Sequence, residues 1–275
     1  MGLTLDEIKR YSRQLVLPNF GSVEQHKLKN AKVAITGAGG LGCPIATYLT
    51  LAGVGRIHII DMDEVDLTNL NRQFLYLPED VGKPKAELAA ERLTEVNPEI
   101  EIEGIMERIT YDNAFDLLKG YDAVVDGTDN FPVRYAVNDA AVVNNIPLFH
   151  GAVLMYEGRA MSIIPKETAC FRCVFPAPPP AGMVPTCREA GVVGSMVGLI
   201  GSIQSMEAIR YLVGHEIALK DRLLIVNGDT MDFQKVLLKR RSDCTACGDT
   251  FVSKPVDEVC ETNAEIQTSQ VEARR

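Results

Sequence analysis

The sequence contains no apolar run long enough to cross a membrane. Its most apolar stretch, residues 191–203, has 13 residues and is followed by the polar Gln204 and Glu207, whereas a membrane-spanning helix needs about 20 apolar residues. Acidic and basic side chains stand in the first ten residues, where a secretory signal would become apolar. No long run of lysine and arginine offers a basic face to nucleic acid. We therefore expect a cytoplasmic protein that binds neither membranes nor nucleic acid.

A P-loop is also missing, since the pattern Gly-x-x-x-x-Gly-Lys-Ser/Thr does not occur. What is present is the composition of a globular protein: 275 residues, 46% of them hydrophobic and 24% charged, with a formal net charge of −9. A compact chain of this length buries roughly 75% of the surface that its unfolded form exposes, so its core can support it without disulfides. A disordered or collagen-like protein is excluded.

The cysteines indicate a metal site. They are Cys43, Cys170, Cys173, Cys187, Cys244, Cys247 and Cys260. Their number is odd, and four of them form two Cys-x-x-Cys pairs, which in a reducing compartment indicates metal ligation or thiol chemistry rather than disulfides. Four thiolates can hold one tetrahedral zinc ion, so Cys170, Cys173, Cys244 and Cys247 are predicted to form a structural zinc clasp between distant segments. Redox-active pairs and single reduced thiols are the alternatives.

Strand and helix patterns alternate through the first half of the chain. Apolar runs predict strands, and helical spacing predicts helices, in the order strand 32–36, helix 43–52, strand 56–61, helix 84–96, strand 99–105, strand 122–126, helix 132–144 and strand 147–151. Before them, residues 4–17 are predicted to form one helix, with Thr4 and Glu7 as a capping box. This alternation predicts a Rossmann-like, doubly wound α/β fold with a mainly parallel sheet.

After residue 151 the pattern favours antiparallel strands. One hairpin is predicted around Glu157-Gly158, with strands at 153–156 and 159–164, and a second around residues 227–229, with strands at 223–226 and 231–238. Residues 192–213 are predicted to form a buried helix. Five prolines in residues 175–185 predict a loop. The mainly parallel sheet is thus expected to be continued by antiparallel strands.

A nucleotide-binding signature lies in the first half. Gly37-x-Gly39-x-x-Gly42 follows a predicted strand and opens a helix, a context in which glycines let the backbone approach a phosphate and the helix amides face it. Asp61, at the end of the second strand, can accept hydrogen bonds from ribose hydroxyls. These features suit a nicotinamide dehydrogenase as well as a mononucleotide-binding enzyme.

Charged residues further along favour nucleotidyl transfer over hydride transfer. Asn69, Arg72, Lys83 and Lys85 follow the ribose aspartate, and Asp-Gly-Thr-Asp-Asn at 126–130 ends a strand at the edge where ligands bind. Two carboxylates there would repel a polyphosphate unless a hard cation such as magnesium lay between them. Cations and a magnesium-binding aspartate meet the charge that develops on phosphate oxygens during phosphoryl or nucleotidyl transfer.

Several segments carry a family resemblance, in order from about residue 4 to residue 248. They are Arg-Tyr-Ser-Arg-Gln at 10–14, the glycine loop 37–42, Asp61, Thr-Asn-Leu-Asn-Arg-Gln at 68–73, Lys85, residues 126–130, both Cys-x-x-Cys pairs, and Thr-Cys-Arg-Glu-Ala-Gly at 186–191. With them the chain resembles the MoeB/ThiF/HesA family, prokaryotic relatives of ubiquitin-activating enzymes. The resemblance implies a single adenylation domain at residues 1–251, with a nucleotide-binding half at about 1–151, an antiparallel, zinc-containing half at about 152–251, and a flexible tail at 252–275.

The resemblance implies ATP- and magnesium-dependent adenylylation of the C-terminal glycine of a ubiquitin-like sulfur carrier of the MoaD or ThiS type. The products would be an acyl-adenylate and pyrophosphate, which prime the carrier for thiocarboxylate formation in molybdopterin or thiamine biosynthesis or in tRNA thiolation. It also implies a homodimer. Since the residues after Gly248 are too few for a rhodanese domain, a separate sulfur donor, a cysteine desulfurase or rhodanese, is expected. The alternatives are an adenylating tRNA-modifying dehydratase of the same superfamily and an NAD-dependent dehydrogenase.

The resemblance also implies residue roles. The nucleotide would be bound by Gly37, Gly39, Gly40, Gly42, Asp61, Asn69, Arg72, Lys85, Asp129 and Asn130. Lys85 would neutralise phosphate charge beside Arg72, Asp129 would bind magnesium, and Arg13 would act as an arginine finger supplied across the homodimer.

The role of Cys187 is left open. Thr186 and Glu189 form a capping box that would place Cys187 in the first turn of a helix, beside Arg188, where a thiol pKa is lowered. It is either a catalytic thiol in sulfur transfer or a bystander. Packing or surface roles are expected for the four histidines, His26, His58, His150 and His215.

Overall fold

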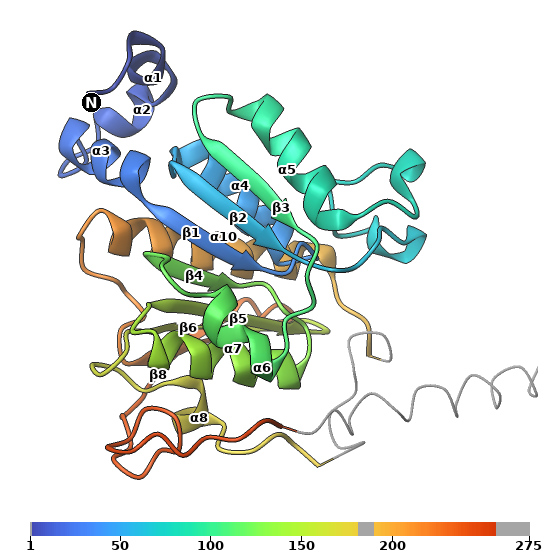
Figure 1. The fold of residues 1–275 in the computed structure, drawn as a ribbon, viewed down its shortest axis with the longest axis vertical. Coiled ribbons are helices and arrows are strands. Elements are labelled where there is room, and N and C mark those ends of the chain that lie inside the picture. The colour runs from blue at the N-terminus through green and yellow to red at the C-terminus, as the bar shows by residue number, and fades with distance from the viewer. Residues whose placement is uncertain (1, 181–189, 257–275) are drawn as a thin grey trace, which may run out of the picture.

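A computed structural model describes residues 2–180 and 190–256 of the chain. They form one eight-stranded sheet in the order β3-β2-β1-β4-β5-β6-β7-β8 (Figure 1). The strands are β1 Lys32–Thr36, β2 Arg56–Ile60, β3 Glu101–Ile105, β4 Ala123–Asp126, β5 Leu148–Leu154, β6 Glu157–Ile163, β7 Arg222–Asn227 and β8 Asp232–Leu237. The first five pair in parallel, and β5 to β8 pair antiparallel. The Rossmann-like fold, mainly parallel and then antiparallel, is confirmed.

Helices cover both faces of this sheet. They are α1 Leu5–Arg10, α2 Ser12–Leu15, α3 Ser22–Asn30, α4 Gly42–Ala52, α5 Lys85–Val96, α6 Tyr111–Leu117, α7 Phe131–Val143, α8 Phe171–Val174 and α10 Gly194–Leu212, with 3-10 turns at Leu67–Asn69 and Pro78–Asp80. One apolar core packs α4, α5 and α10 against one face, and a second packs α6, α7 and α8 against the other (Figure 1). None of the helices in the described ranges is long and apolar enough to cross a membrane.

The long helix α10 packs tightly against the start of α4. A Cβ on Gly201 would lie 2.5 Å from a side-chain carbon of Pro44, and one on Gly194 would lie 2.8 Å from the carbonyl oxygen of Asn71. Because these glycines let the backbones approach closely within one chain, α10 lies next to the glycine loop that precedes α4. This packing forms one wall of the candidate site.

The predicted N-terminal helix is wrong in its length. The capping box of Thr4 and Glu7 is present, but the helix ends at Arg10 and a second short helix starts at Ser12. Tyr11 lies between them, is buried, and accepts a hydrogen bond on its hydroxyl from Nδ2 of Asn97 at 2.9 Å. The break therefore reflects a contact with the end of α5, which the local sequence does not reveal.

The first predicted hairpin is correct in kind but its turn is displaced. The predicted strands at 147–151 and 153–156 are one strand, β5, and the turn is formed by Met155 and Tyr156 rather than by Glu157-Gly158. Gly158 lies within β6, where a Cβ would come within 2.5 Å of Ile200 on α10. This glycine serves helix packing, not the turn. The hairpin of β7 and β8 is confirmed.

Candidate active site and metal centre

The candidate site lies where the strand order changes direction. β1 and β4 are neighbours at the centre of the sheet, while the chain continues from β1 to β2 on one side and from β4 to β5 on the other. A crevice for ligands forms at such a switch point, beyond the carboxyl ends of the strands. The glycine loop follows β1, Asp61 follows β2, and the loop 127–130 follows β4. The fold therefore brings all three predicted segments to one edge.

Two of the motif glycines are required by packing within the protein. A Cβ on Gly42 would lie 2.0 Å from the carbonyl oxygen of Gly37. Gly37 itself has φ +99°, and a Cβ on it would lie 3.0 Å from the carbonyl oxygen of Gly127. Gly39 and Gly40 have room by comparison, since a Cβ would meet the side chains of Gln73 and Arg72 at 3.6 and 3.5 Å. Gly37 and Gly42 thus shape the loop.

Asp61 ties the glycine loop to the end of β2. Its carboxylate accepts backbone hydrogen bonds from Ala38 and Asp63, each at 2.7 Å. Burial raises the pKa of Asp61, and these two hydrogen bonds oppose that shift. Because an ionised carboxylate can accept about four hydrogen bonds, Asp61 keeps the capacity to accept more.

Two cations border the loop. The side-chain carbons of Arg72 lie against Gly40, and its Nη1 donates at 3.0 Å to the carbonyl oxygen of Thr68 and to Oδ1 of Asn71, which are both uncharged acceptors. Lys85 begins α5; its side chain is buried, and Nζ lies 3.3 Å from Oδ2 of the exposed Asp63. Within the described ranges, the positive charge of Arg72 has no anionic partner.

Asn69 and Lys83, which the sequence also placed in this region, both interact with other residues of the protein. Asn69 closes the 3-10 turn at Leu67–Asn69, and its Oδ1 accepts a hydrogen bond from the backbone of Asp66 at 3.2 Å. Lys83 does not join Lys85, because its Nζ pairs with Asp80 at 3.2 Å. A hollow of about 330 Å³ adjoins Arg72, and it is lined by Leu70, Asn71, Arg72, Phe74, Gly194, Ser195 and Gly198. The sequence did not predict a hollow beside α10.

The loop after β4 exposes one carboxylate rather than two. Asp129 is exposed and makes no hydrogen bond or ion pair with any residue that the structure describes. Asn130 caps α7 by accepting a hydrogen bond from the backbone of Val133 at 3.0 Å. Asp126 is buried and pairs with His150. The expectation that both aspartates face the nucleotide is therefore wrong for Asp126.

Arg13 lies at the other end of α4. It is exposed on α2, and the neighbouring Gln14 donates a hydrogen bond at 3.2 Å to the carbonyl oxygen of Ala52, the last residue of α4. The glycine loop precedes the first turn of this helix, and eleven residues of α-helix span about 16 Å. Within one chain, Arg13 is not brought to the loop.

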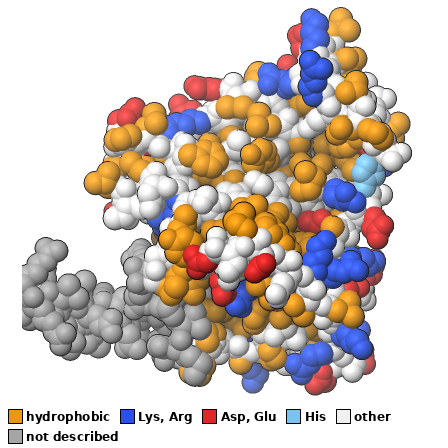
Figure 2. Space-filling view, turned by 180° about the vertical axis from the view of Figure 1, so that it is seen from behind, with side chains coloured by type: hydrophobic (Ala, Val, Ile, Leu, Met, Phe, Trp, Pro, Cys, Tyr) orange, Lys and Arg blue, Asp and Glu red, His pale blue; other side chains and the backbone are white. Residues whose placement is uncertain are grey.

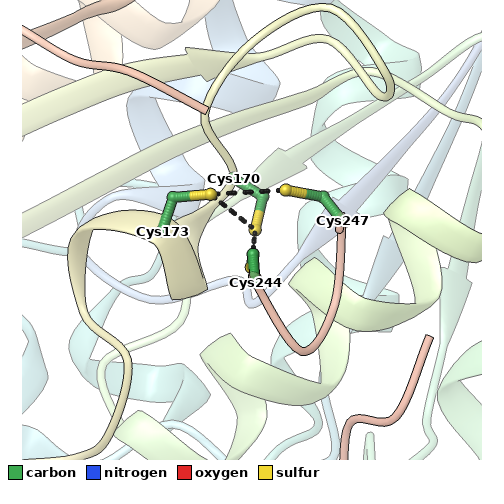
Figure 3. Close-up of side chains that lie close together, drawn as sticks. All are labelled: Cys170, Cys173, Cys244 and Cys247. Carbon is green, nitrogen blue, oxygen red and sulfur yellow. Dashed lines mark hydrogen bonds between the residues drawn. The ribbon is translucent and has the colours of Figure 1, made fainter. Parts of the chain in front are cut away.

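The four cysteines of the predicted clasp converge (Figure 3). Their sulfur atoms all lie within 4.8 Å of one another, with Cys170 3.5 Å from Cys244 and Cys173 3.3 Å from Cys247. In a tetrahedral site with Zn–S bonds of about 2.3 Å, the sulfurs are about 3.8 Å apart. The donor set and its dimensions therefore fit zinc, and in the described residues no other group of three or more acidic, histidine or cysteine side chains could hold a metal.

A buried ion pair reinforces the clasp. Arg172, between the first two cysteines, donates from Nη2 to Oδ2 of Asp139 on α7 at 2.8 Å and to the carbonyl oxygen of Lys254 at 2.9 Å. Ser253 also donates to Asp139, and the ring of Phe251 contacts Phe115. Residues 251–256 form no helix or strand but pack against α6 and α7.

Three cysteines of the sequence, Cys43, Cys187 and Cys260, are not among the predicted clasp residues. Cys43 is buried in α4, and burial raises the pKa of its thiol to about 12, so it is an unreactive core thiol. Within the clasp, hydrogen bonds among the four thiols lower the pKa of Cys173 and Cys244 and raise the pKa of Cys170 and Cys247, so the cluster shares its protons. Cys187 and its capping box, and Cys260, lie outside the described residues.

A profile of the ThiF family matches residues 11–246, most of the chain. The chain belongs to the ThiF family. The resemblance inferred from the motifs is thereby confirmed, and the matched range includes the glycine loop and the predicted clasp cysteines except Cys247.

Relatives with assigned names come from all three domains of life. The sulfur carrier protein adenylyltransferase of Thermus thermophilus is 44% identical over 254 residues, which cover 90% of this chain and 94% of that protein. The SAMP-activating enzyme E1 of Haloferax volcanii is 40% identical and covers 94% of this chain and 96% of its own length. The adenylyltransferase and sulfurtransferase MOCS3 of Culex quinquefasciatus is 44% identical, but the chain spans only 57% of it.

Solved structures share the fold. Escherichia coli MccB with ATP superposes with a TM-score of 0.76 at 25% identity, covering 87% of this chain and 75% of MccB. A second MccB structure, with MccA-N7isoASN, gives a TM-score of 0.77 at the same identity and the same coverage.

Proposed function

We propose that this chain adenylylates the C-terminal glycine of a ubiquitin-like sulfur carrier with ATP and magnesium, releasing pyrophosphate. The chain is an enzyme of the adenylyltransferase class, in line with the names of its full-length relatives. The observation that carries the proposal is the set of charges around the glycine loop that lack full partners among the described residues: Arg72 has only uncharged acceptors, and Asp129 has no partner there. Such charges suit a triphosphate and its metal.

Catalysis by this site would come from positioning and neutralisation. A carboxylate is a weak nucleophile toward an anionic phosphate, so charge on the phosphate oxygens has to be offset and the reacting groups held in line. Arg72 and Lys85 would neutralise the phosphates, and Asp61 would hold the ribose. Magnesium, when bound with the nucleotide, would neutralise further phosphate charge. Asp129 would be its ligand, and Mg²⁺ is commonly held by one or two carboxylates together with substrate phosphates.

The other predicted site residues would also contribute to nucleotide binding. Gly39 and Gly40 would pass closest to the phosphates, on a loop that Gly37 and Gly42 shape. Asn69 would contact the nucleotide from the 3-10 turn. Asn130, whose side chain caps α7, would act by fixing the position of its neighbour Asp129.

Arg13 would reach the site of a second copy of the chain. Hydrophobic side chains gather over the face that α4 and α10 cover (Figure 2). Among them Tyr48 and Leu51 on α4 are 48% and 46% exposed, and Met206 on α10 is 58% exposed. An exposed apolar patch of this kind is typical of an interface. We propose that it joins a homodimer in which each Arg13 serves the partner's nucleotide.

The other parts of the proposal concern sulfur. Zinc would be structural, because four thiolates leave no open coordination position. A separate cysteine desulfurase or rhodanese would supply sulfur to the activated carrier. If Cys187 is catalytic, its thiolate would attack the acyl-adenylate, forming a thioester with the C-terminal glycine of the carrier and releasing AMP.

The test is pyrophosphate exchange into ATP. We expect exchange that requires both magnesium and a carrier ending in Gly-Gly, and that is lost in Asp129→Ala. The control is Asp122→Ala: this exposed aspartate precedes β4 and accepts a hydrogen bond from the backbone of Lys32 at 2.8 Å, and its replacement should retain exchange. Exchange with tRNA and without a carrier would favour the dehydratase alternative, and tight NADH binding without exchange would favour a dehydrogenase. Full activity of Asp129→Ala would contradict the magnesium role.

A further inference from the structure

A buried histidine–aspartate pair lies beneath the loop that presents Asp129. Asp126 ends β4, His150 lies opposite it in β5, and both side chains are buried. Nδ1 of His150 is 2.7 Å from Oδ2 of Asp126. Neither side chain takes part in the function proposed above, and the sequence predicted only a packing or surface role for this histidine.

The second oxygen of Asp126 organises the loop itself. Oδ1 accepts hydrogen bonds from the backbone N–H of Thr128 at 2.9 Å and from its hydroxyl at 2.7 Å. The carbonyl oxygen of Thr128 in turn accepts a hydrogen bond from Nη2 of Arg134 at 3.0 Å. A Cβ on Gly127 would lie 3.1 Å from backbone atoms of the glycine loop and of β1, so Gly127 is closely packed, and Asn130 caps α7. Every residue from 126 to 130 except Asp129 is thus fixed by the protein.

The charges around the pair favour an ionised aspartate and a neutral histidine. Burial lowers the pKa of His150, Asp126 raises it, and Arg134 lowers it again. Burial alone would raise the pKa of Asp126, but the hydrogen bond from His150 brings it below its ordinary value. The other neighbours are uncharged: Gln204 on α10 donates to the carbonyl oxygen of Asp126 at 2.7 Å, and the ring of Phe171 lies 4.8 Å from the imidazole. His150 therefore donates from Nδ1 to a carboxylate.

We propose that His150 is a positioning residue: by donating to Asp126 it holds the loop 126–130 in the one shape that presents Asp129 to the magnesium–nucleotide complex. The inference rests on the proposed role of Asp129 in binding magnesium. Residues that orient a metal ligand typically change metal affinity by about 10–100-fold when they are replaced. The effect should therefore appear in the magnesium requirement rather than in folding alone.

The experiment measures ATP binding by calorimetry over a series of magnesium concentrations in three variants. His150→Leu removes the donor, and we expect its half-saturating magnesium concentration to rise about 10-fold. His150→Asn keeps an amide donor near the place of Nδ1 and should stay within about 3-fold of the wild type. His58→Leu is the matched control: His58 is also hydrogen-bonded, to Tyr121 at 2.8 Å, but it lies on β2 away from the loop, so its magnesium requirement should not change.

Two results would overturn the proposal: an unchanged magnesium requirement in His150→Leu, or an equal loss in His150→Asn. Should His150→Leu not fold, Thr128→Val removes another donor to Asp126 while keeping the side-chain shape, and the same shift is expected. Because the readout is ATP binding, failure of the proposed function is seen separately, as magnesium-dependent binding of ATP without exchange in the presence of a carrier.

Discussion

Replacing Arg172 by methionine should destabilise the protein far more than replacing a surface arginine. Arg172 and Asp139 form an ion pair at 2.8 Å whose side chains are 6% and 0% exposed. Methionine keeps most of the apolar stem but leaves the carboxylate of Asp139 buried without a cation. Breaking a buried pair in this way costs about 3–5 kcal/mol, out of a total stability of about 5–15 kcal/mol for a typical domain.

The control is Arg241→Met. Arg241 pairs with Asp243 at 2.9 Å, nearly the same distance, but the two side chains are 42% and 73% exposed. An exposed pair contributes about 0–1 kcal/mol. The comparison therefore contrasts a buried ion pair with an exposed one of nearly equal length.

Urea unfolding in excess zinc, followed by far-ultraviolet circular dichroism, measures both variants; the chain has no tryptophan to serve as a fluorescent probe. Arg172→Met combined with Asp139→Asn should recover part of the loss, because the amide removes the stranded charge. A loss below about 1 kcal/mol in Arg172→Met, no larger than in Arg241→Met, would refute the view that burial makes this pair structurally important.

Three further predictions follow from the same structure. Chelation of zinc, or Cys173→Ser, should lower the melting temperature and increase protease cleavage near the clasp, since four clustered sulfurs then lack their metal; unchanged melting on metal removal would speak against a structural site. Burial raises the pKa of Asp80, but the backbone N–H of Leu77 and the side chains of Arg92 and Lys83 outweigh it and bring the pKa below its ordinary value. The stabilisation is therefore complete above the unfolded pKa of about 3.9 and lost as the pH falls through the lower folded value, so Asp80→Asn should flatten the dependence of unfolding free energy on pH between about 5 and 2. If Arg13 acts across a dimer, Arg13→Ala and Asp129→Ala should each be inactive alone, yet regain about a quarter of wild-type exchange when their subunits are mixed, because half of the dimers then contain one intact site; no recovery after proven subunit mixing would exclude the shared site.

Local signals predicted the parts of the fold that depend on neighbours in sequence. β1 matches its predicted bounds, and α4 ends at Ala52, followed by Gly53, which adopts φ +82° as a helix-terminating glycine should. The cysteine spacing predicted the clasp because two Cys-x-x-Cys pairs in a reducing compartment indicate metal ligation or thiol chemistry. Three helices, α3, α6 and α8, were not predicted. In α3 only Gln25 and Leu28 are buried, so its sequence carries almost no apolar periodicity.

The rest depends on contacts between residues far apart in the chain. Both aspartates of the motif at 126–130 were expected to face the nucleotide, and only the pairing of β4 with β5 shows that Asp126 binds His150 instead. Arg172 looked like a residue between two cysteines, yet its partner lies 33 positions away on α7. A motif specifies residue types, but contacts between distant parts of the chain decide which of these side chains already have a partner.

That distinction separates structural from functional charges in this chain. A buried charge is tolerated only when it is paired and hydrogen-bonded, and Asp126, Asp139 and Arg172 meet this condition fully. At the switch point of the sheet the charges are not fully paired: Arg72 donates only to uncharged oxygens, and Asp129 has no partner among the residues described. Folding gains nothing from leaving these groups so, whereas a triphosphate with its magnesium would supply both missing charges at once. The incomplete pairing therefore supports the proposed site on physical grounds that do not depend on the family resemblance.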